Sequence, residues 1–224
     1  MKSKKIAVGL CVLALLLALF QVGMAEESEA QLRLVATAYP LYDMAKSISG
    51  EYVEVLYMPE ATAEDAKNAD ILFCMSQEQD SWAAEVEGAR LLFAADGLDL
   101  LEGDGDFLTI PVNNMICASY LADILGEMDA EHNDLYQQNV AAYVEAMSDM
   151  DLRIREATAQ SEGTKISCED GSMTYFAREY GLELSDGEEE AIVLHTYIHP
   201  AEEDEEVPYL QLMERNLAAL EAGI

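Results

Sequence analysis

Positive charge is scarce in this chain of 224 residues. Lysine and arginine together number 12, against 44 aspartates and glutamates, so the formal net charge is −32 at pH 7. A field of this sign repels nucleic-acid phosphates and anionic lipid, so we expect no nucleic-acid partner. Two interpretations of the carboxylates remain: they keep the surface solvated, or they attract cations, which surface carboxylates do weakly and without selectivity.

Cysteine is also rare. The four cysteines, Cys11, Cys74, Cys117 and Cys168, are widely spaced, which excludes a disulfide-rich scaffold and a CxxC metal knuckle. Cys11 lies too far inside an apolar run for a lipid-modified cysteine, so we expect no lipid anchor. The other three can form at most one disulfide, and we expect them to be buried structural cysteines.

Common catalytic and nucleotide-binding motifs are absent from the sequence. It contains no GxSxG nucleophile elbow, no P-loop, no GxGxxG and no HExxH. The methionines in the second half recur at helical spacing, which is typical of a helix core and not of a copper site. We therefore expect a binding protein and not an enzyme.

The first 25 residues have the features of a signal peptide. Three lysines precede an apolar run over residues 6–20, and the small residues Gly23 and Ala25 fit a signal-peptidase site before Glu26. Without the three leader lysines the net charge becomes −35. The protein would then act outside the cytoplasm, in the periplasm or at the cell surface. The alternative is an uncleaved anchor, because residues 6–25 are just long enough to cross a bilayer.

After the leader, strand patterns alternate with helix patterns. β-prone segments cover residues 32–38, 53–57, 71–74 and 91–93. Helical segments cover residues 40–49, 63–68, 81–87 and 112–125, the last with Ile116, Tyr120 and Ile124 on one face. This alternation predicts a parallel sheet with helices on its faces.

A long amphipathic helix is predicted from Asp129, its expected N-cap. Apolar residues then recur at alternating steps of four and three: Tyr136, Val140, Tyr143, Met147, Met150, Ile154 and Ala157. Beyond this helix, strands are predicted at 165–168 and 192–198, and helices at 173–180 and 208–220. The second half therefore has too few elements for a full α/β lobe.

Six segments in chain order carry a family resemblance. They are 35–50, 69–73 with the following Trp82, 111–113, 129–143, 175–183 and 209–217. Together they resemble the zinc and manganese solute-binding proteins of bacterial ABC transporters over nearly the whole chain after the leader.

The resemblance implies an α/β fold with two lobes, similar to periplasmic binding proteins, joined by a long helix. It divides the chain into a signal peptide at 1–25, an N-terminal α/β lobe at 26–128, a connecting helix at 129–161 and a C-terminal lobe at 162–224. This second lobe is truncated, because the family's segment between Gly181 and Ile192 is deleted here. The implied function is to hold a divalent metal ion, Zn²⁺ or Mn²⁺, and deliver it to a membrane permease.

The resemblance also implies where metal ligands stand, and the family's imidazoles are missing there. No histidine follows residues 58–60, the place of the first, while Asp106 and Asp170 occupy the places of the second and third. Carboxylates at these positions favour a harder cation, such as Mn²⁺, Ca²⁺ or Mg²⁺, over Zn²⁺. Asp104 and Glu169 are neighbouring alternatives.

The chain has three histidines, His132, His195 and His199. His132, in the first turn of the long helix, is expected to be a polar surface residue. His195 and His199 are four apart in a predicted strand, which places both on one face. They could share a metal, or they could be two solvated histidines beside the acidic loop 202–206.

Two hypotheses of function follow. The first is an extracytoplasmic solute-binding protein of a divalent metal ion ABC importer, a monomer that works with a permease. It requires Asp106, Asp170 and a third donor, such as His195 or His199, to converge within about 5 Å. The alternative is a degenerate family member without a metal site that acts as an envelope interaction or accessory protein.

Overall fold

A computed structural model of the chain describes residues 31–100, 106–161, 163–185, 187 and 190–224. The predicted signal peptide lies outside these residues. Residues 32–224 form one unit by their internal contacts. Among the described helices, none combines the length and the apolar character of a membrane span.

The first sheet has four parallel strands in the order β2-β1-β3-β4. Their bounds are β1 Leu32–Ala36, β2 Val53–Tyr57, β3 Ile71–Cys74 and β4 Arg90–Phe93. All four residues of β3 are buried, as expected of an inner strand covered on both faces in a parallel sheet. In the register of this sheet, Leu34 of β1 lies opposite Val55 on one side and Ile71 on the other.

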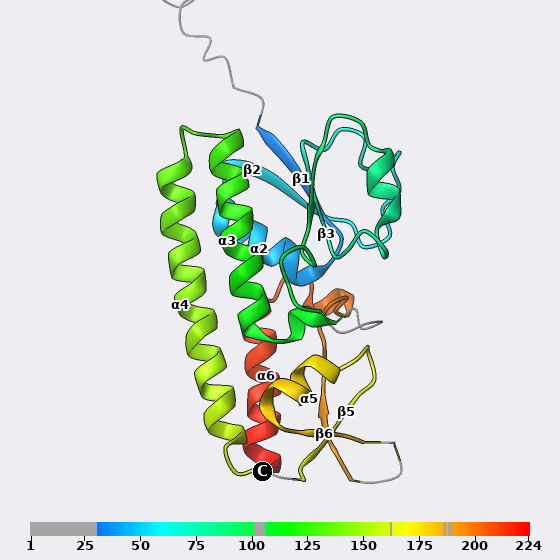
Figure 1. Ribbon diagram of the computed structural model, residues 1–224, viewed down its shortest axis with the longest axis vertical. Coiled ribbons are helices and arrows are strands. Elements are labelled where there is room, and N and C mark those ends of the chain that lie inside the picture. The colour runs from blue at the N-terminus through cyan, green and yellow to red at the C-terminus, as the bar shows by residue number, and fades with distance from the viewer. Residues whose placement is uncertain (1–30, 101–105, 162, 186, 188–189) are drawn as a thin grey trace, which may run out of the picture. The chain divides into compact units, whose positions relative to one another are not determined.

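Three helices accompany this sheet: α2 Tyr39–Ser49, α3 Pro111–Met128 and α4 Asn133–Thr158. Pro40 lies in the first turn of α2, and Gly50, with φ 60°, ends that helix. α2 packs on β1 and β2 and against α3 and α4, while α3 and α4 run side by side (Figure 1).

The second sheet has three parallel strands in the order β6-β5-β7. The strands are β5 Lys165–Cys168, β6 Glu183–Leu184 and β7 Ile192–Leu194, and the helices are α5 Thr174–Tyr180 and α6 Tyr209–Gly223. α4 packs against α6 as well as against α2 and α3 (Figure 1). One long helix thus packs against α2, which lies on β1 and β2, and against α6, which lies on β7. The predicted α/β class with a small second sheet is confirmed.

Two predicted helices are wrong or shortened. Residues 63–68 form turns, because the Asp65 carboxylate accepts hydrogen bonds from the Thr62 N–H at 3.0 Å and the Thr62 hydroxyl at 2.6 Å, which holds the chain in a local turn. Residues 81–87 reduce to the 3₁₀ helix η1, Ser81–Glu85.

The predicted apolar face of α3 is also wrong. Ile124 is buried, but Ile116 and Tyr120 are exposed by 44% and 42%. The buried face runs instead through Cys117, Ala118, Leu121 and Leu125.

The start of α4 differs from the prediction as well. Asp129 ends α3, and the N-cap of α4 is His132. The Asp129 carboxylate lies 2.7 Å from His132 Nδ1 and accepts a hydrogen bond from the Tyr136 hydroxyl at 2.5 Å. The His132 ring stacks on Tyr52 with 3.8 Å between ring centroids. His132 therefore has polar and ring partners at the α3–α4 junction, while its side chain stays 29% exposed.

An exposed ion pair between Arg153 of α4 and Glu214 of α6 links the two helices, with Nη2 and Oε2 2.8 Å apart. Both side chains are about 40% exposed. We expect Glu214→Gln to lower the free energy of unfolding by less than about 1 kcal/mol, because water and salt screen exposed pairs. Urea unfolding at low salt and at about 1 M salt checks this: a loss that persists at high salt would contradict it.

Candidate metal centre

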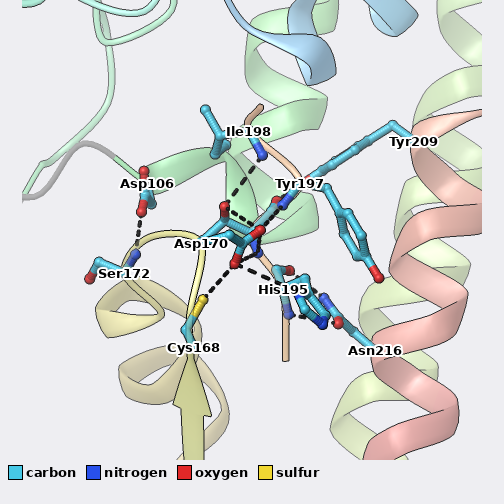
Figure 2. A network of polar contacts seen from close by, with 10 residues as sticks. Asp106, Cys168, Asp170, Ser172, His195, Tyr197, Ile198, Tyr209 and Asn216 are labelled. Carbon is cyan, nitrogen blue, oxygen red and sulfur yellow. Dashed lines mark hydrogen bonds and ion pairs between the residues drawn. The ribbon is translucent and has the colours of Figure 1, made fainter. Parts of the chain in front are cut away.

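Asp170 lies in the turn that follows β5, and its carboxylate collects protein donors (Figure 2). The N–H of Thr196 lies 3.1 Å from each carboxylate oxygen, and the N–H of Tyr197 lies 3.3 Å from Oδ2. The thiol of Cys168 donates to Oδ1 at 2.9 Å. Asp170 thereby holds the segment after β7 against the end of β5.

These donors set the charge state of Asp170. Burial alone would raise the pKa of its carboxyl. The hydrogen bonds from Cys168, Thr196 and Tyr197, together with the nearby His195, outweigh burial and lower that pKa below its ordinary value. The carboxylate is therefore ionised at neutral pH and can act as an oxygen ligand for a divalent cation.

The carboxylate of Asp106 contacts the same turn. Asp106 follows β4 in the chain and caps η2, Phe107–Thr109, and its Oδ2 accepts a hydrogen bond from the N–H of Ser172 (Figure 2). Between the two carboxylates lies Gly171, where a Cβ atom would be 2.5 Å from Asp106 Oδ2 and 2.9 Å from Thr196 Cγ2. The absence of a side chain at Gly171 allows Asp106 to approach the turn.

The predicted strand 192–198 is wrong beyond Leu194, where β7 ends. The side-chain amide of Asn216 on α6 accepts from the His195 N–H at 3.0 Å and donates to the His195 carbonyl at 2.7 Å. Asp170 takes the next two N–H groups, and Tyr197 adopts φ 52°, a left-handed conformation uncommon for a residue with a side chain. Side-chain partners from α6 and the β5 turn thus replace the strand ladder.

The two histidines consequently do not lie on one strand face. His195 stays near the carboxylates, with its Nδ1 3.8 Å from Asp170 Oδ1 and its side chain 43% exposed. His199 instead lies with its Nδ1 3.1 Å from the Tyr57 hydroxyl at the end of β2. The expected strand geometry is therefore wrong, and a metal shared by the two histidines stays a proposal.

Asp80 is a buried carboxylate that sequence reasoning missed. It accepts hydrogen bonds from the Thr37 hydroxyl at 3.2 Å and the Met75 N–H at 2.8 Å, residues that directly follow β1 and β3. The strand order reverses between β1 and β3. In open α/β sheets, ligands usually bind beside the carboxyl ends of the strands at this point. In the sequence, the feature that could have indicated Asp80 is its position shortly after the fully apolar strand Ile71–Cys74.

Burial and nearby carboxylates both affect the pKa of His199. Burial lowers the pKa of its imidazole below the ordinary value, while the negative charges of Asp106 and then Asp80 act in the opposite direction. His199 is therefore neutral at pH 7, the form that can donate a nitrogen lone pair to a metal ion.

The remaining candidates are placed as follows. Asp104 lies outside the described residues, and Glu169 is exposed. Cys74 and Cys117 are buried as predicted, but Cys168 is only partly buried, and its role is the hydrogen bond to Asp170. Within the described ranges, no three His, Cys, Asp or Glu side chains are arranged closely enough to hold a metal ion. The structure thus brings Asp106 to the turn that holds Asp170, but the convergence of three donors that the importer hypothesis requires is not assembled among the described residues.

Asn216 offers a test of how the 195–199 segment is positioned. We expect Asn216→Ala to lower the free energy of unfolding by about 1 to 3 kcal/mol, because the N–H and the carbonyl of His195 lose a partner in a largely buried place. Chemical denaturation measures this, with Asn139→Ala as control, since Asn139 makes one side-chain hydrogen bond, to the Ile48 carbonyl. Equal losses in the two variants would contradict the special role of Asn216.

Comparison with known proteins gives one family. Residues 34–193 match the family model ZnuA, described as zinc-uptake complex component A periplasmic. Among curated proteins, the manganese ABC transporter substrate-binding lipoprotein PsaA of Streptococcus pneumoniae is 27% identical over 192 residues, which cover 70% of this chain and 62% of PsaA. The high-affinity zinc uptake system protein ZnuA of Bacillus subtilis is 23% identical over 197 residues, covering 71% and 62%.

Solved structures agree in fold. The metal-dependent lipoprotein YcdH of Bacillus subtilis superposes with a TM-score of 0.74 at 20% identity, covering 86% of this chain and 99% of that one. Zn(II)-bound AdcA of Streptococcus pneumoniae gives the same TM-score and identity, covering 87% of this chain and 58% of AdcA. At this identity the likeness establishes the fold alone.

Proposed function

Because the chain belongs to the ZnuA family of periplasmic zinc-uptake components, we propose that it is the extracytoplasmic solute-binding protein of a divalent metal ion ABC importer. The aligned part of the chain spans about six-tenths of the length of its curated relatives, so the cargo, the permease partner and the monomeric state all belong to this proposal. Binding and not catalysis is the proposed activity, and the periplasm or cell surface is the proposed location.

One observation carries the proposal: the carboxylate of Asp106, from the segment after β4, accepts a hydrogen bond from the N–H of Ser172, two residues after Asp170 in the turn that follows β5. A cation held there would connect the two proposed lobes, residues 26–128 and 162–224, on either side of the connecting helix 129–161. Carboxylates from both lobes on one ion are a direct way to couple cargo binding to the arrangement of the lobes.

The donors available at this turn indicate the class of cargo. Asp106 and Asp170 supply oxygens, and His195, 3.8 Å from Asp170 through Nδ1, supplies a nitrogen. Oxygen ligands suit Mn²⁺, and an imidazole nitrogen extends the choice to Zn²⁺. His199 completes the proposed ligand set from the side of Tyr57.

Thermal unfolding tests the proposal. The chelator-stripped protein is titrated separately with Zn²⁺, Mn²⁺, Ca²⁺ and Mg²⁺ at physiological salt. We expect a saturable rise in the unfolding temperature with Zn²⁺ or Mn²⁺, corresponding to about 4 kcal/mol at a thousandfold excess over the dissociation constant. Small, non-saturating rises shared by all four ions would reflect charge screening alone and would favour the accessory-protein alternative.

A further inference from the structure

One residue of α2, Tyr39, holds both ends of the segment 199–207, which lies between β7 and α6. The backbone N–H of Tyr39 donates to the carbonyl of Ile198 at 2.9 Å, next to the first end. Its hydroxyl donates to the carbonyl of Val207 at 2.7 Å, at the second end. Tyr39 itself is buried. We call the segment 199–207 the strap, because a single anchor on another element fastens it at both ends.

Between these ends the strap is loosely held. Its middle forms one short 3₁₀ helix, η3 Glu202–Asp204, which buries none of its residues. Among the described residues, two side-chain contacts reach out of the strap: Asp204 accepts from Arg215 of α6 at 2.8 Å, and His199 Nδ1 lies 3.1 Å from the Tyr57 hydroxyl. Both of these contacts are exposed, so water can replace either partner when the strap moves.

Cavities flank the strap on both sides. One of about 670 Å³ lies between His199 and the loop after β2, and another of about 450 Å³ lies between residues 205 and 206 and α2. Their walls share one cluster of tyrosine rings, with centroids 5.6 to 5.8 Å apart: Tyr39, Tyr42 and Tyr57. The strap therefore lacks on its flanks the close packing that fixes core segments.

The charge of the strap also opposes its closed position. Residues 202–206 are five consecutive carboxylates, in a chain of net charge −32. Among the described residues, the ion pair of Asp204 with Arg215 offsets one of these charges. Like charges held close together repel one another, and the repulsion falls as they separate in water. Detachment of the strap relieves part of this repulsion.

We propose that the strap is a movable cover: residues 199–207 detach from α2 and return while both sheets stay folded, and Tyr39 is the latch. Segments with few buried contacts open at a fraction of the free energy of global unfolding. Detachment joins the two cavities into one groove along the tyrosine cluster and uncovers the Tyr39 ring. This inference goes beyond the proposed function and holds whether or not the chain binds a metal ion.

Hydrogen exchange of the metal-free full chain, followed by mass spectrometry, tests the inference. The N–H of Asp204 donates to the Ala201 carbonyl at 2.8 Å, and the N–H of Val207 donates to the Asp204 carbonyl at 3.0 Å. A single 3₁₀ turn does not persist alone, so these amides exchange whenever the strap detaches. Tyr39→Phe should speed exchange in the strap about two- to tenfold, the effect of one lost hydrogen bond on an opening equilibrium.

Two further variants separate local detachment from global unfolding. Tyr42→Phe changes the same ring cluster, but the Tyr42 hydroxyl contacts Lys46, so this matched control should leave exchange in the strap as in wild type. Ile154→Val weakens the buried face of α4. It should speed exchange in α4 about two- to tenfold and leave the strap unchanged. Strap exchange that is indifferent to Tyr39→Phe, or that Ile154→Val speeds as much as exchange in α4, would overturn the inference.

Discussion

Asp170→Asn should abolish the metal-dependent stabilisation of this protein. The substitution removes the negative charge that a divalent cation requires, and the amide NH₂ replaces one of the two oxygens that accept hydrogen bonds from Cys168, Thr196 and Tyr197. We expect metal affinity to fall by at least about 100-fold, the upper end of the loss for a single supporting group. Without metal, the free energy of unfolding should fall by about 1 to 3 kcal/mol, the cost of a poorly satisfied partly buried group.

The same variant has a pH signature. The folded-state pKa of Asp170 is lowered, so its ionised form contributes stability above the unfolded value of about 3.9. That contribution is lost as the pH falls through the lower folded value. Wild type should therefore lose more stability than Asp170→Asn in this acidic window.

Isothermal titration and denaturation across pH measure both effects of Asp170→Asn. Asp149→Asn, which removes one exposed charge from α4, is the control and should retain metal affinity. Equal losses in the two variants would mean that only the general negative field attracts cations, and Asp170 would have no ligand role.

Gly171→Ala is the second change with a large expected effect. Gly171 is not among the residues with positive φ, so alanine fits its backbone conformation. Any loss of stability then comes from the new methyl group. That methyl would lie 2.5 Å from Asp106 Oδ2 and 2.9 Å from Thr196 Cγ2. The Asp106 carboxylate must then leave the N–H of Ser172. We expect a loss of about 1 to 3 kcal/mol from overpacking and a loss of metal-dependent stabilisation.

A double-mutant cycle with Asp106→Ala isolates the contact. Removal of the Asp106 carboxylate relieves one of the two close contacts, so Gly171→Ala should destabilise the Asp106→Ala background less than wild type. Thermal unfolding of the four proteins without metal measures the coupling. Strict additivity would show that Gly171 does not serve the approach of Asp106.

The parallel sheets and the long helix were predictable from the sequence because each depends on a local period. The buried run Ile71–Cys74 formed an inner strand, and the step of four and three from Tyr136 to Ile154 formed the buried face of α4. Residue periodicity reports which side chains a regular element can bury, whichever element covers them.

The errors arose where distant side chains decide the backbone. The strand expected to reach Ile198 stops at Leu194 because Asn216 of α6 and Asp170 of the β5 turn take its N–H groups. Periodicity in the segment itself carries no information about those partners. The face of α3 was misassigned for a similar reason, since Ala118 and Leu121 are fully buried while Ile116 is exposed, and the buried face depends on which elements cover the helix.

The candidate site was predictable in part. The resemblance named Asp106 and Asp170, and the structure brings both to one turn, but the place of Asp80 between the ends of β1 and β3 depends on the sheet order. Sequence spacing alone does not specify which strands are neighbours.

The most direct test of the account is the amount of metal bound per chain. Purified protein is dialysed to equilibrium against buffered Zn²⁺ or Mn²⁺, and bound metal is measured by elemental analysis, together with Asp106→Asn and Asp170→Asn. The account predicts one ion per wild-type chain, at saturation, and none in either variant at the same free metal concentration. Wild-type protein that binds no ion, or several ions without saturation and equally in both variants, would contradict a metal centre at the turn 170–172.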